Sequence, residues 1–84
     1  QYEIYVGRFY YRTDYYLAAI GRFEWVLANY PDYIGHDETL FYLGKSAMEV
    51  RDKDKMQSAF TRLIREYPNS SYLGDARKLL ASHS

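Results

Sequence analysis

The sequence repeats itself with a period of 37 residues, and this internal repeat constrains the fold more than any other feature. Periods of roughly 20–50 residues are typical of solenoids and other stacked repeats. A third copy begins near the C-terminus, where Asp75 aligns with Glu38 and Leu80 with Leu43. Identical residues that coincide under this shift are Tyr5 and Tyr42, Gly7 and Gly44, Phe23 and Phe60, Tyr30 and Tyr67, and Pro31 and Pro68.

Apolar residues within each copy follow the period of an α-helix. The second copy has apolar residues at i, i+3, i+4, i+7, i+8 and i+11, which form one stripe along a helix. These residues are Met56, Ala59, Phe60, Leu63, Ile64 and Tyr67, and the first copy has a similar stripe of Ala19, Ile20, Phe23, Val26, Leu27 and Tyr30. Sustained alternation with turn signals is not found, so the pattern predicts an all-α fold without strands.

Turn-forming residues divide the stripes into separate helices. Asp14 and Asp52 stand between apolar stripes and are predicted to cap the helices that follow them. Pro31 and Pro68 end the second and fourth helices, because proline disfavours helical geometry in the residue before it. Candidate caps for the last helix are Asn69, Ser70 and Ser71. The predicted helices span residues 2–12, 15–29, 36–50, 53–66 and 71–81.

Charge and cysteine content exclude several classes of function. The chain carries 11 Lys and Arg against 11 Asp and Glu, so its formal net charge is zero, and nucleic acid is not an expected partner. It has no cysteine and therefore no disulfide or Cys-ligated metal. The chain begins with Gln1 rather than Met, which predicts that it is a piece of something longer.

Catalytic and metal-binding patterns are weak. His36 and His83 are the only histidines, and no spacing singles out a general acid and base pair. The His36–Glu38 run has no second histidine at i+4, so its carboxylates are better explained as complements to a helix dipole. The sequence therefore predicts a protein that is not an enzyme and that has no metal or cofactor.

Aromatic side chains are abundant, and a platform that stacks sugars or bases is one explanation for them. Helix packing explains their spacing better, and no surplus of basic residues accompanies the rings. We expect core or half-buried packing for these aromatics, which are Tyr10, Tyr11, Tyr15, Tyr16 and Trp25.

The two copies resemble the tetratricopeptide repeat (TPR), whose pattern is Trp-x2-Leu-Gly-x2-Tyr, Ala-x3-Phe and Pro. The first copy reads Val6-Gly7-x2-Tyr10, Ala19-x3-Phe23 and Pro31, and the second reads Leu40-x2-Leu43-Gly44-x2-Ala47, Met56-x3-Phe60 and Pro68. The resemblance implies an α-α superhelix of two helix-turn-helix repeats and a capping helix. Residues 1–84 then form one domain, with repeat 1 at about 2–31, repeat 2 at about 36–68 and the cap at about 71–81.

A narrower resemblance concerns the runs RFEWVLANYPDY and RLIREYPNSSYLGDARKLL. They are similar to the C-terminal repeats of the BamD (YfiO) family, the periplasmic lipoproteins of the outer-membrane β-barrel assembly machinery. The resemblance implies a protein-interaction scaffold that helps to insert β-barrel proteins. Its partners would be components of the same machinery, and its lipid anchor would lie upstream of Gln1, on the periplasmic face of the outer membrane.

Proteins with tetratricopeptide repeats usually bind partners on the concave face, which is formed by the first helix of each repeat. Tyr and Arg are enriched at binding hot spots, which favours a groove lined by these residue types. Solvated helix faces whose aromatics pack on neighbours are the competing explanation. The candidate partner-binding residues are Tyr5, Arg8, Arg12, Tyr42, Lys45 and Glu49.

The sequence is also compatible with two other functions, and it predicts that the chain associates with itself. The chain is also similar in style to adaptors of other cell-envelope or secretion systems, such as the Tol–Pal coordinator. A module that binds a small ligand or peptidoglycan through the aromatic groove is a third possibility. In a longer solenoid a preceding repeat would cover Ile4, Phe9 and Tyr11, so self-association of this chain through its N-terminal face is expected.

Overall fold

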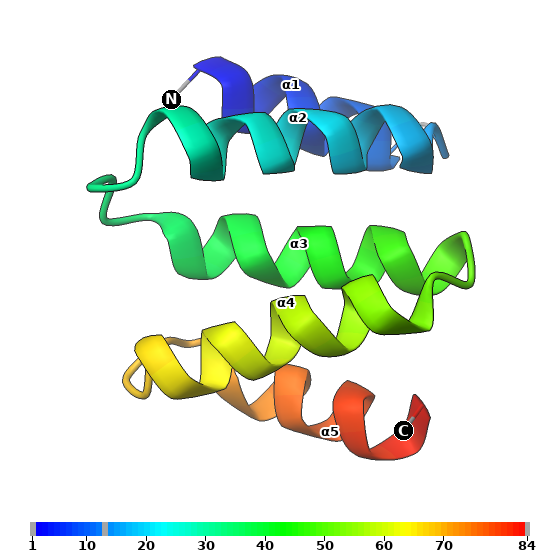
Figure 1. The fold of residues 1–84 in the computed structure, drawn as a ribbon, viewed down its shortest axis with the longest axis vertical. Coiled ribbons are helices and arrows are strands. Elements are labelled where there is room, and N and C mark those ends of the chain that lie inside the picture. The colour runs from blue at the N-terminus through cyan, green and yellow to red at the C-terminus, as the bar shows by residue number, and fades with distance from the viewer. Residues whose placement is uncertain (1, 13, 84) are drawn as a thin grey trace.

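The structure is a computed structural model that describes residues 2–12 and 14–83, with side chains from residue 6 onward within those ranges. Its helices are α1 (Tyr2–Arg12), α2 (Tyr16–Asn29), α3 (His36–Glu49), α4 (Lys53–Glu66) and α5 (Leu73–His83) (Figure 1). The all-α prediction is confirmed, and the helix ends lie within two residues of the predicted ones. In the described ranges, no helix is long and apolar enough to cross a membrane.

Each helix packs against the next helix along the chain. The contacts run from α1 to α2, α2 to α3, α3 to α4 and α4 to α5, and α1 also reaches α3. Figure 1 shows the resulting stack of helix pairs, in which α5 covers α4 at the C-terminal end. This arrangement is the predicted TPR-like pair of repeats with a capping helix.

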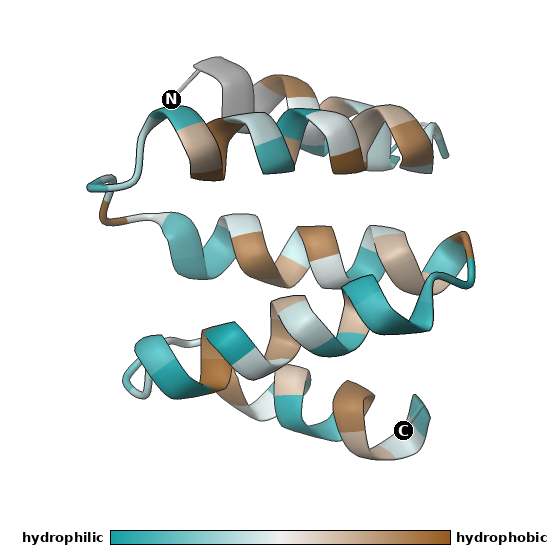
Figure 2. Cartoon of the chain, in the orientation of Figure 1, coloured by the Kyte–Doolittle hydropathy of each residue, from teal (hydrophilic) through white to brown (hydrophobic). Residues whose placement is uncertain are grey.

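The hydrophobic core runs through the whole stack. The apolar stripes predicted for α2 and α4 face inward except at Tyr30, which is 42% exposed, and Phe23 and Phe60 are completely buried. Figure 2 shows the same pattern, with hydrophobic and hydrophilic residues alternating around each helix. The buried cluster consists of Ala19, Ile20, Phe23, Leu40, Phe41, Leu43, Ala47, Met56, Ala59, Phe60, Leu63 and Ala76.

The first helix of each repeat ends in the same backbone conformation. Asp14 and Arg51, which are 37 residues apart, have positive φ angles of 65° and 62°. The amide N–H of the next residue donates to the carbonyl five residues earlier, from Tyr15 to Tyr10 at 2.8 Å and from Asp52 to Ala47 at 2.9 Å. This is the Schellman arrangement that closes many helices. The internal repeat therefore extends to the backbone of the turns.

The predicted helix cap is confirmed at Asp52 and wrong at Asp14. The Asp52 side chain accepts a hydrogen bond from the Lys55 N–H at 3.1 Å, as a helix cap does. Ser70 accepts the Tyr72 N–H at 3.0 Å, but Tyr72 precedes the first residue of α5, so this bond closes the turn before the helix and is not a cap of the helix itself. Asp14 instead belongs to the turn that ends α1, and its carboxylate accepts the Tyr16 hydroxyl at 2.8 Å. The N-cap position of α2 is Tyr15, whose side chain makes no capping bond.

Two glycines set the distance between the helices of each pair. A Cβ atom added at Gly7 would lie 2.5 Å from a ring carbon of Phe23, and one added at Gly44 would lie 2.4 Å from the equivalent atom of Phe60. Both distances are far below a van der Waals contact. The buried phenylalanine rings therefore pack directly on the backbone of the preceding helix, which only glycine permits.

Replacing Gly44 by alanine is expected to lower the free energy of unfolding. The new methyl group overpacks the core against Phe60, which typically costs about 1–3 kcal/mol. Gly21→Ala is the matched control, because Gly21 is also helical and its added Cβ meets nothing within 4 Å. Removing that glycine stabilises the helix by roughly 0.5–1 kcal/mol. Urea denaturation followed by circular dichroism measures both changes, and a stabilising Gly44→Ala would contradict the packing role.

Candidate functional site

The predicted site residues Arg8, Tyr42 and Lys45 meet where α1 and α3 lie side by side. The Arg8 guanidinium carbon lies 5.8 Å from the centre of the Tyr42 ring. The Lys45 ammonium lies 5.6 Å from the Tyr11 ring centre and 5.5 Å from that of Phe41. These distances are within the range of cation–π attraction. The first helices of the two repeats thus present two cations, each placed over aromatic rings.

Tyr42 is at the centre of the aromatic cluster on this face. Its ring centre lies 5.2 Å from that of Tyr11, 5.4 Å from Phe41, 6.2 Å from Tyr72 and 6.4 Å from Phe23. Aromatic pairs at such separations contribute about 0.5–1.5 kcal/mol beyond their buried area. The half-buried Tyr42 ring therefore connects the surface of α3 to the hydrophobic core.

Glu38 joins the cation of α1 to the segment that leads into α5. One of its carboxylate oxygens lies 3.2 Å from the Arg8 guanidinium and accepts a hydrogen bond from the Tyr72 hydroxyl at 3.3 Å. Asp37 next to it accepts a hydrogen bond from Ser70 at 2.6 Å. We call the surface formed by Arg8, Tyr11, Glu38, Tyr42, Lys45 and Tyr72 the first-helix face.

The remaining predicted site residues lie outside this cluster. Arg12 and Glu49 occupy the last turns of α1 and α3 and are exposed. Tyr5 belongs to α1, and its side chain is outside the described residues. Sequence reasoning missed Tyr11, Glu38 and Tyr72, because Tyr72 comes from a segment 34 residues beyond Glu38 and meets it only in the folded stack.

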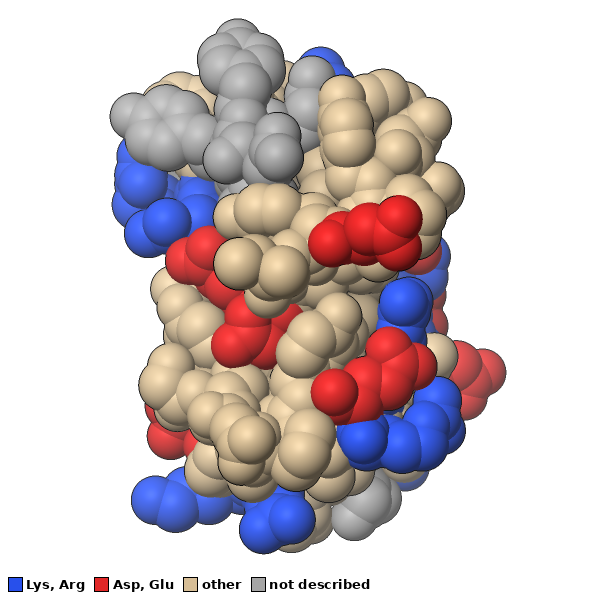
Figure 3. All heavy atoms as spheres, turned by 90° about the vertical axis from the view of Figure 1, so that its left-hand side faces the viewer, with Lys and Arg blue, Asp and Glu red and all other residues tan. Residues whose placement is uncertain are grey.

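Charges of both signs alternate on the side of the molecule where α3 and α5 begin. Figure 3 shows acidic side chains near the middle of this side and basic ones at its upper left and lower edge. A continuous basic track of the kind that follows a phosphate backbone is not seen on this side. This side of the molecule therefore carries separate acidic and basic groups.

His36 is completely buried, and its ring serves the fold. Its Nε2 lies 2.5 Å from the Tyr30 carbonyl oxygen, and its Nδ1 lies 3.4 Å from the Thr39 hydroxyl. The imidazole thus ties the start of α3 to the end of α2. Within residues 2–12 and 14–83, no three His, Cys, Asp or Glu side chains are grouped so that they could hold a metal ion.

The other aromatic residues divide into packed and exposed ones. Tyr11 contacts Tyr16 edge-on, with ring centres 5.6 Å apart, and both are half-buried as predicted. Tyr15 is 62% exposed and Trp25 is also exposed, so the prediction of half-buried packing is wrong for these two. Tyr15 precedes α2 and touches Tyr10 of α1 only at a ring edge, with ring centres 6.4 Å apart, and Trp25 lies on an exposed part of α2. The helical spacing alone does not distinguish these exposed positions from the packed ones.

Sequentially packed helix pairs with a C-terminal capping helix define the class of TPR-like helical repeat proteins. The sequence model of the YfiO family, described as outer membrane lipoproteins, matches residues 1–57, and the chain belongs to this family. The resemblance stated from the sequence is thereby confirmed. The expectation of a non-enzymatic protein agrees with this family.

A relative from Rickettsia prowazekii (strain Madrid E) is the outer membrane protein assembly factor BamD. It is 33% identical to this chain over 81 residues, which cover 96% of the chain and 32% of that protein. The chain thus spans about a third of the length of this relative. No solved structure matches the chain significantly.

The pKa of the Tyr72 hydroxyl reports whether this hydroxyl lies next to the Glu38 carboxylate. Burial raises the pKa of Tyr72 above its ordinary value of 10.0, and the nearby Glu38 carboxylate raises it further. The fold therefore favours the protonated Tyr72 hydroxyl, and this contribution to stability is complete below the ordinary pKa and is lost as pH rises through the higher pKa of the folded state.

We expect Glu38→Gln to lower the pKa of Tyr72. The phenolate absorbance of each protein is measured against pH, and the same titration of Tyr72→Phe is subtracted to isolate this residue. A Tyr72 that ionises at its ordinary pKa in the folded protein would show that the hydroxyl is not held next to the carboxylate.

Proposed function

We propose that this chain is part of a periplasmic protein-interaction scaffold that helps to insert β-barrel proteins into the outer membrane. Membership of an outer-membrane lipoprotein family supports this role, as does similarity to an assembly factor. Partners would be other components of the β-barrel assembly machinery, and a lipid anchor outside this sequence would attach the protein to the membrane. The family also favours this role over that of a Tol–Pal adaptor.

The first-helix face is the proposed binding surface, with residues 1–84 acting as one domain of two repeats and a cap. The observation that carries this proposal is the placement of Arg8 and Lys45 over aromatic rings on neighbouring first helices. Arginine and tyrosine supply a large share of the binding energy in protein interfaces. Tyr11 and Tyr42 are held by their neighbours, so little side-chain freedom is lost when a partner binds.

The internal ion pair of Arg8 does not prevent such binding. The Arg8 side chain remains 41% exposed while it contacts Glu38. Exposed ion pairs typically contribute only about 0.2–1 kcal/mol, because water and salt screen them. An acidic group of a partner therefore competes for the Arg8 guanidinium at a small cost.

Charge reversal at Arg8 or Lys45 is expected to weaken partner binding by about tenfold or more. Arg8→Glu and Lys45→Glu each replace a cation that faces the partner, and both keep the helices intact. Arg65→Glu is the matched control, because Arg65 is 69% exposed and lies on the second helix of its repeat. Binding is measured with purified components of the assembly machinery, and circular dichroism checks the fold.

The three variants separate the proposed surface from its alternatives. Equal binding by Arg8→Glu, Lys45→Glu and the parent chain would exclude the first-helix face as the binding surface. A loss limited to Arg65→Glu would assign binding to the outer surface of α4 instead.

Self-association of this chain through its N-terminal face is a second proposal. Phe9 of α1 is exposed, and Leu17 of α2 is 75% exposed. Ile4 also belongs to the predicted surface, and its side chain is outside the described residues. Tyr11 is half-buried against Tyr42, so it contributes less to this surface than predicted.

Sedimentation over a concentration series tests self-association. We expect the chain to form larger species at millimolar concentration, and Leu17→Glu to prevent this because it places a charge in the contact. Ile34→Glu is the control, since Ile34 is 91% exposed but lies in the loop between α2 and α3. A chain that stays monomeric throughout the series would refute the proposal.

A further inference from the structure

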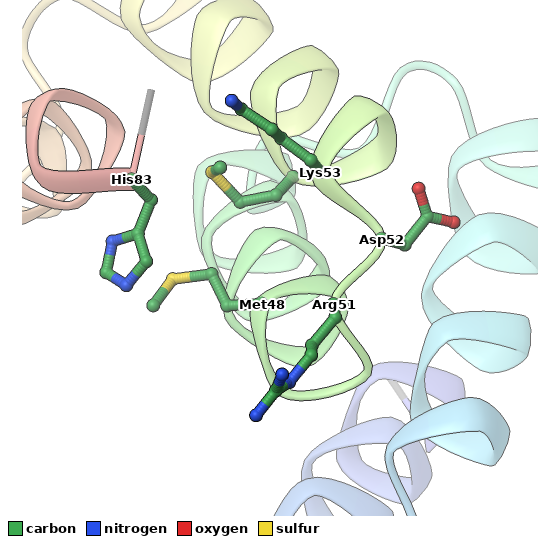
Figure 4. A pocket seen from close by; sticks show the side chains of 6 residues that line it. Met48, Arg51, Asp52, Lys53 and His83 are labelled. Carbon is green, nitrogen blue, oxygen red and sulfur yellow. The ribbon is translucent and has the colours of Figure 1, made fainter.

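A cavity lies at the end of the stack opposite Glu38, where α3 ends, α4 begins and α5 ends. Its volume is about 200 Å³. Both methionines of the chain and its second histidine line it, although they are far apart in the sequence. The lining residues are Met48, Arg51, Asp52, Lys53, Met56 and His83 (Figure 4).

Three helices each supply one donor atom to this cavity, two of them soft thioether sulfurs and the third an imidazole nitrogen. Met48 comes from α3, Met56 from α4 and His83 from α5. Figure 4 shows the side chains of Met48 and His83 extending toward one another, whereas the Asp52 carboxylate extends away from them. Thioether sulfur and imidazole nitrogen together are ligands that Cu(I) accepts and that Mg²⁺ and Ca²⁺ do not favour.

The hydrogen bonds of His83 leave one ring nitrogen available as a ligand. Its Nδ1 lies 3.0 Å from the Leu79 carbonyl oxygen and 3.0 Å from the Ser82 hydroxyl. A carbonyl oxygen only accepts hydrogen bonds, so Nδ1 carries the proton of the neutral ring. Nε2 then keeps its lone pair. Histidine ligands of metals are typically oriented by such a hydrogen bond from the other nitrogen.

The charges around the cavity favour a monovalent ion over a divalent one. Arg51 and Lys53 line the cavity, and their repulsion of a bound cation grows with the charge of that cation. The Asp52 carboxylate, which would favour a divalent ion, is used as the cap of α4 through the Lys55 N–H. The surroundings therefore disfavour Zn²⁺ more strongly than Cu(I) or its analogue Ag(I).

We propose that Met48, Met56 and His83 form a binding site for one soft monovalent metal ion, Cu(I), at this end of the helix stack. Binding would connect α3, α4 and α5 and hold the C-terminal turn of α5 on the repeat that it caps. None of the three ligands belongs to the first-helix face, and Met48 and His83 lie in the last turns of α3 and α5.

Silver ion is the first probe, since it shares the ligand preference of Cu(I) and is not oxidised in air. The chain has two methionines, so its methionine methyl groups give two NMR signals, and both are expected to shift with one equivalent of Ag(I). Competition with a Cu(I)-chelating dye under reducing conditions then gives the affinity for Cu(I). Zn²⁺ at the same concentration is expected to leave both methyl signals in place.

Two ligand variants and one control decide the assignment. Met48→Leu and His83→Gln are each expected to weaken Ag(I) and Cu(I) binding by about tenfold or more. Met48→Leu nearly conserves side-chain volume, and His83 is exposed, so both variants should keep the fold, which circular dichroism verifies. Lys53→Gln removes a charge without removing a ligand, and it should preserve or increase the affinity.

Several results would overturn the proposal. Methyl signals that do not respond to Ag(I) would show that the two sulfurs do not act together. Unchanged affinity in both Met48→Leu and His83→Gln would show that any bound metal is held elsewhere. Zn²⁺ binding as tight as that of Ag(I) would contradict the predicted preference for a soft monovalent ion.

Discussion

The contact between a glycine backbone and a buried phenylalanine ring sets the geometry of both repeats. Gly7 meets Phe23 and Gly44 meets Phe60, so each helix pair is as close as the ring allows. This spacing determines where the first helix of each repeat lies relative to the core. Because both repeats use the same contact, α1 and α3 lie side by side and bring Arg8 to Tyr42 and Lys45 to Tyr11. The first-helix face therefore depends on the glycine contacts within each repeat and on the packing of α2 against α3 between the repeats.

Much of the fold was predictable because its determinants are local and occur twice. The apolar stripes, the prolines and the glycine positions each appear in both copies at the same spacing. Two independent copies of one pattern specify the helices and their pairing more firmly than a single helix pattern does. The proximity of Arg8, Tyr42 and Lys45 was predictable for the same reason. Their positions in the two copies place them on the first helices of neighbouring repeats.

The parts of the structure that escaped prediction depend on contacts between segments that are far apart in the chain. Glu38 looks like an ordinary acidic residue in the first turn of a helix, and only the folded stack places Tyr72 next to it. The burial of His36 follows from the return of the chain after Pro31, which brings the imidazole to the Tyr30 carbonyl. The exposure of Tyr15 depends on which surface of α2 is left uncovered, and no local spacing encodes that choice.

Arg51, which lines the proposed metal site, has a positive φ angle of 62°. Non-glycine residues in this conformation are often found at functional sites, where strain supports a mechanism. Arg51 lines the proposed metal site, which invites that explanation. However, Asp14 adopts the same conformation one repeat earlier, at a turn that contributes nothing to the cavity. The conformation is therefore a property of the turn that closes each first helix, where the Schellman hydrogen bonds offset its cost. The methionines and His83, which have no equivalents in the first repeat, are what distinguish this end of the stack.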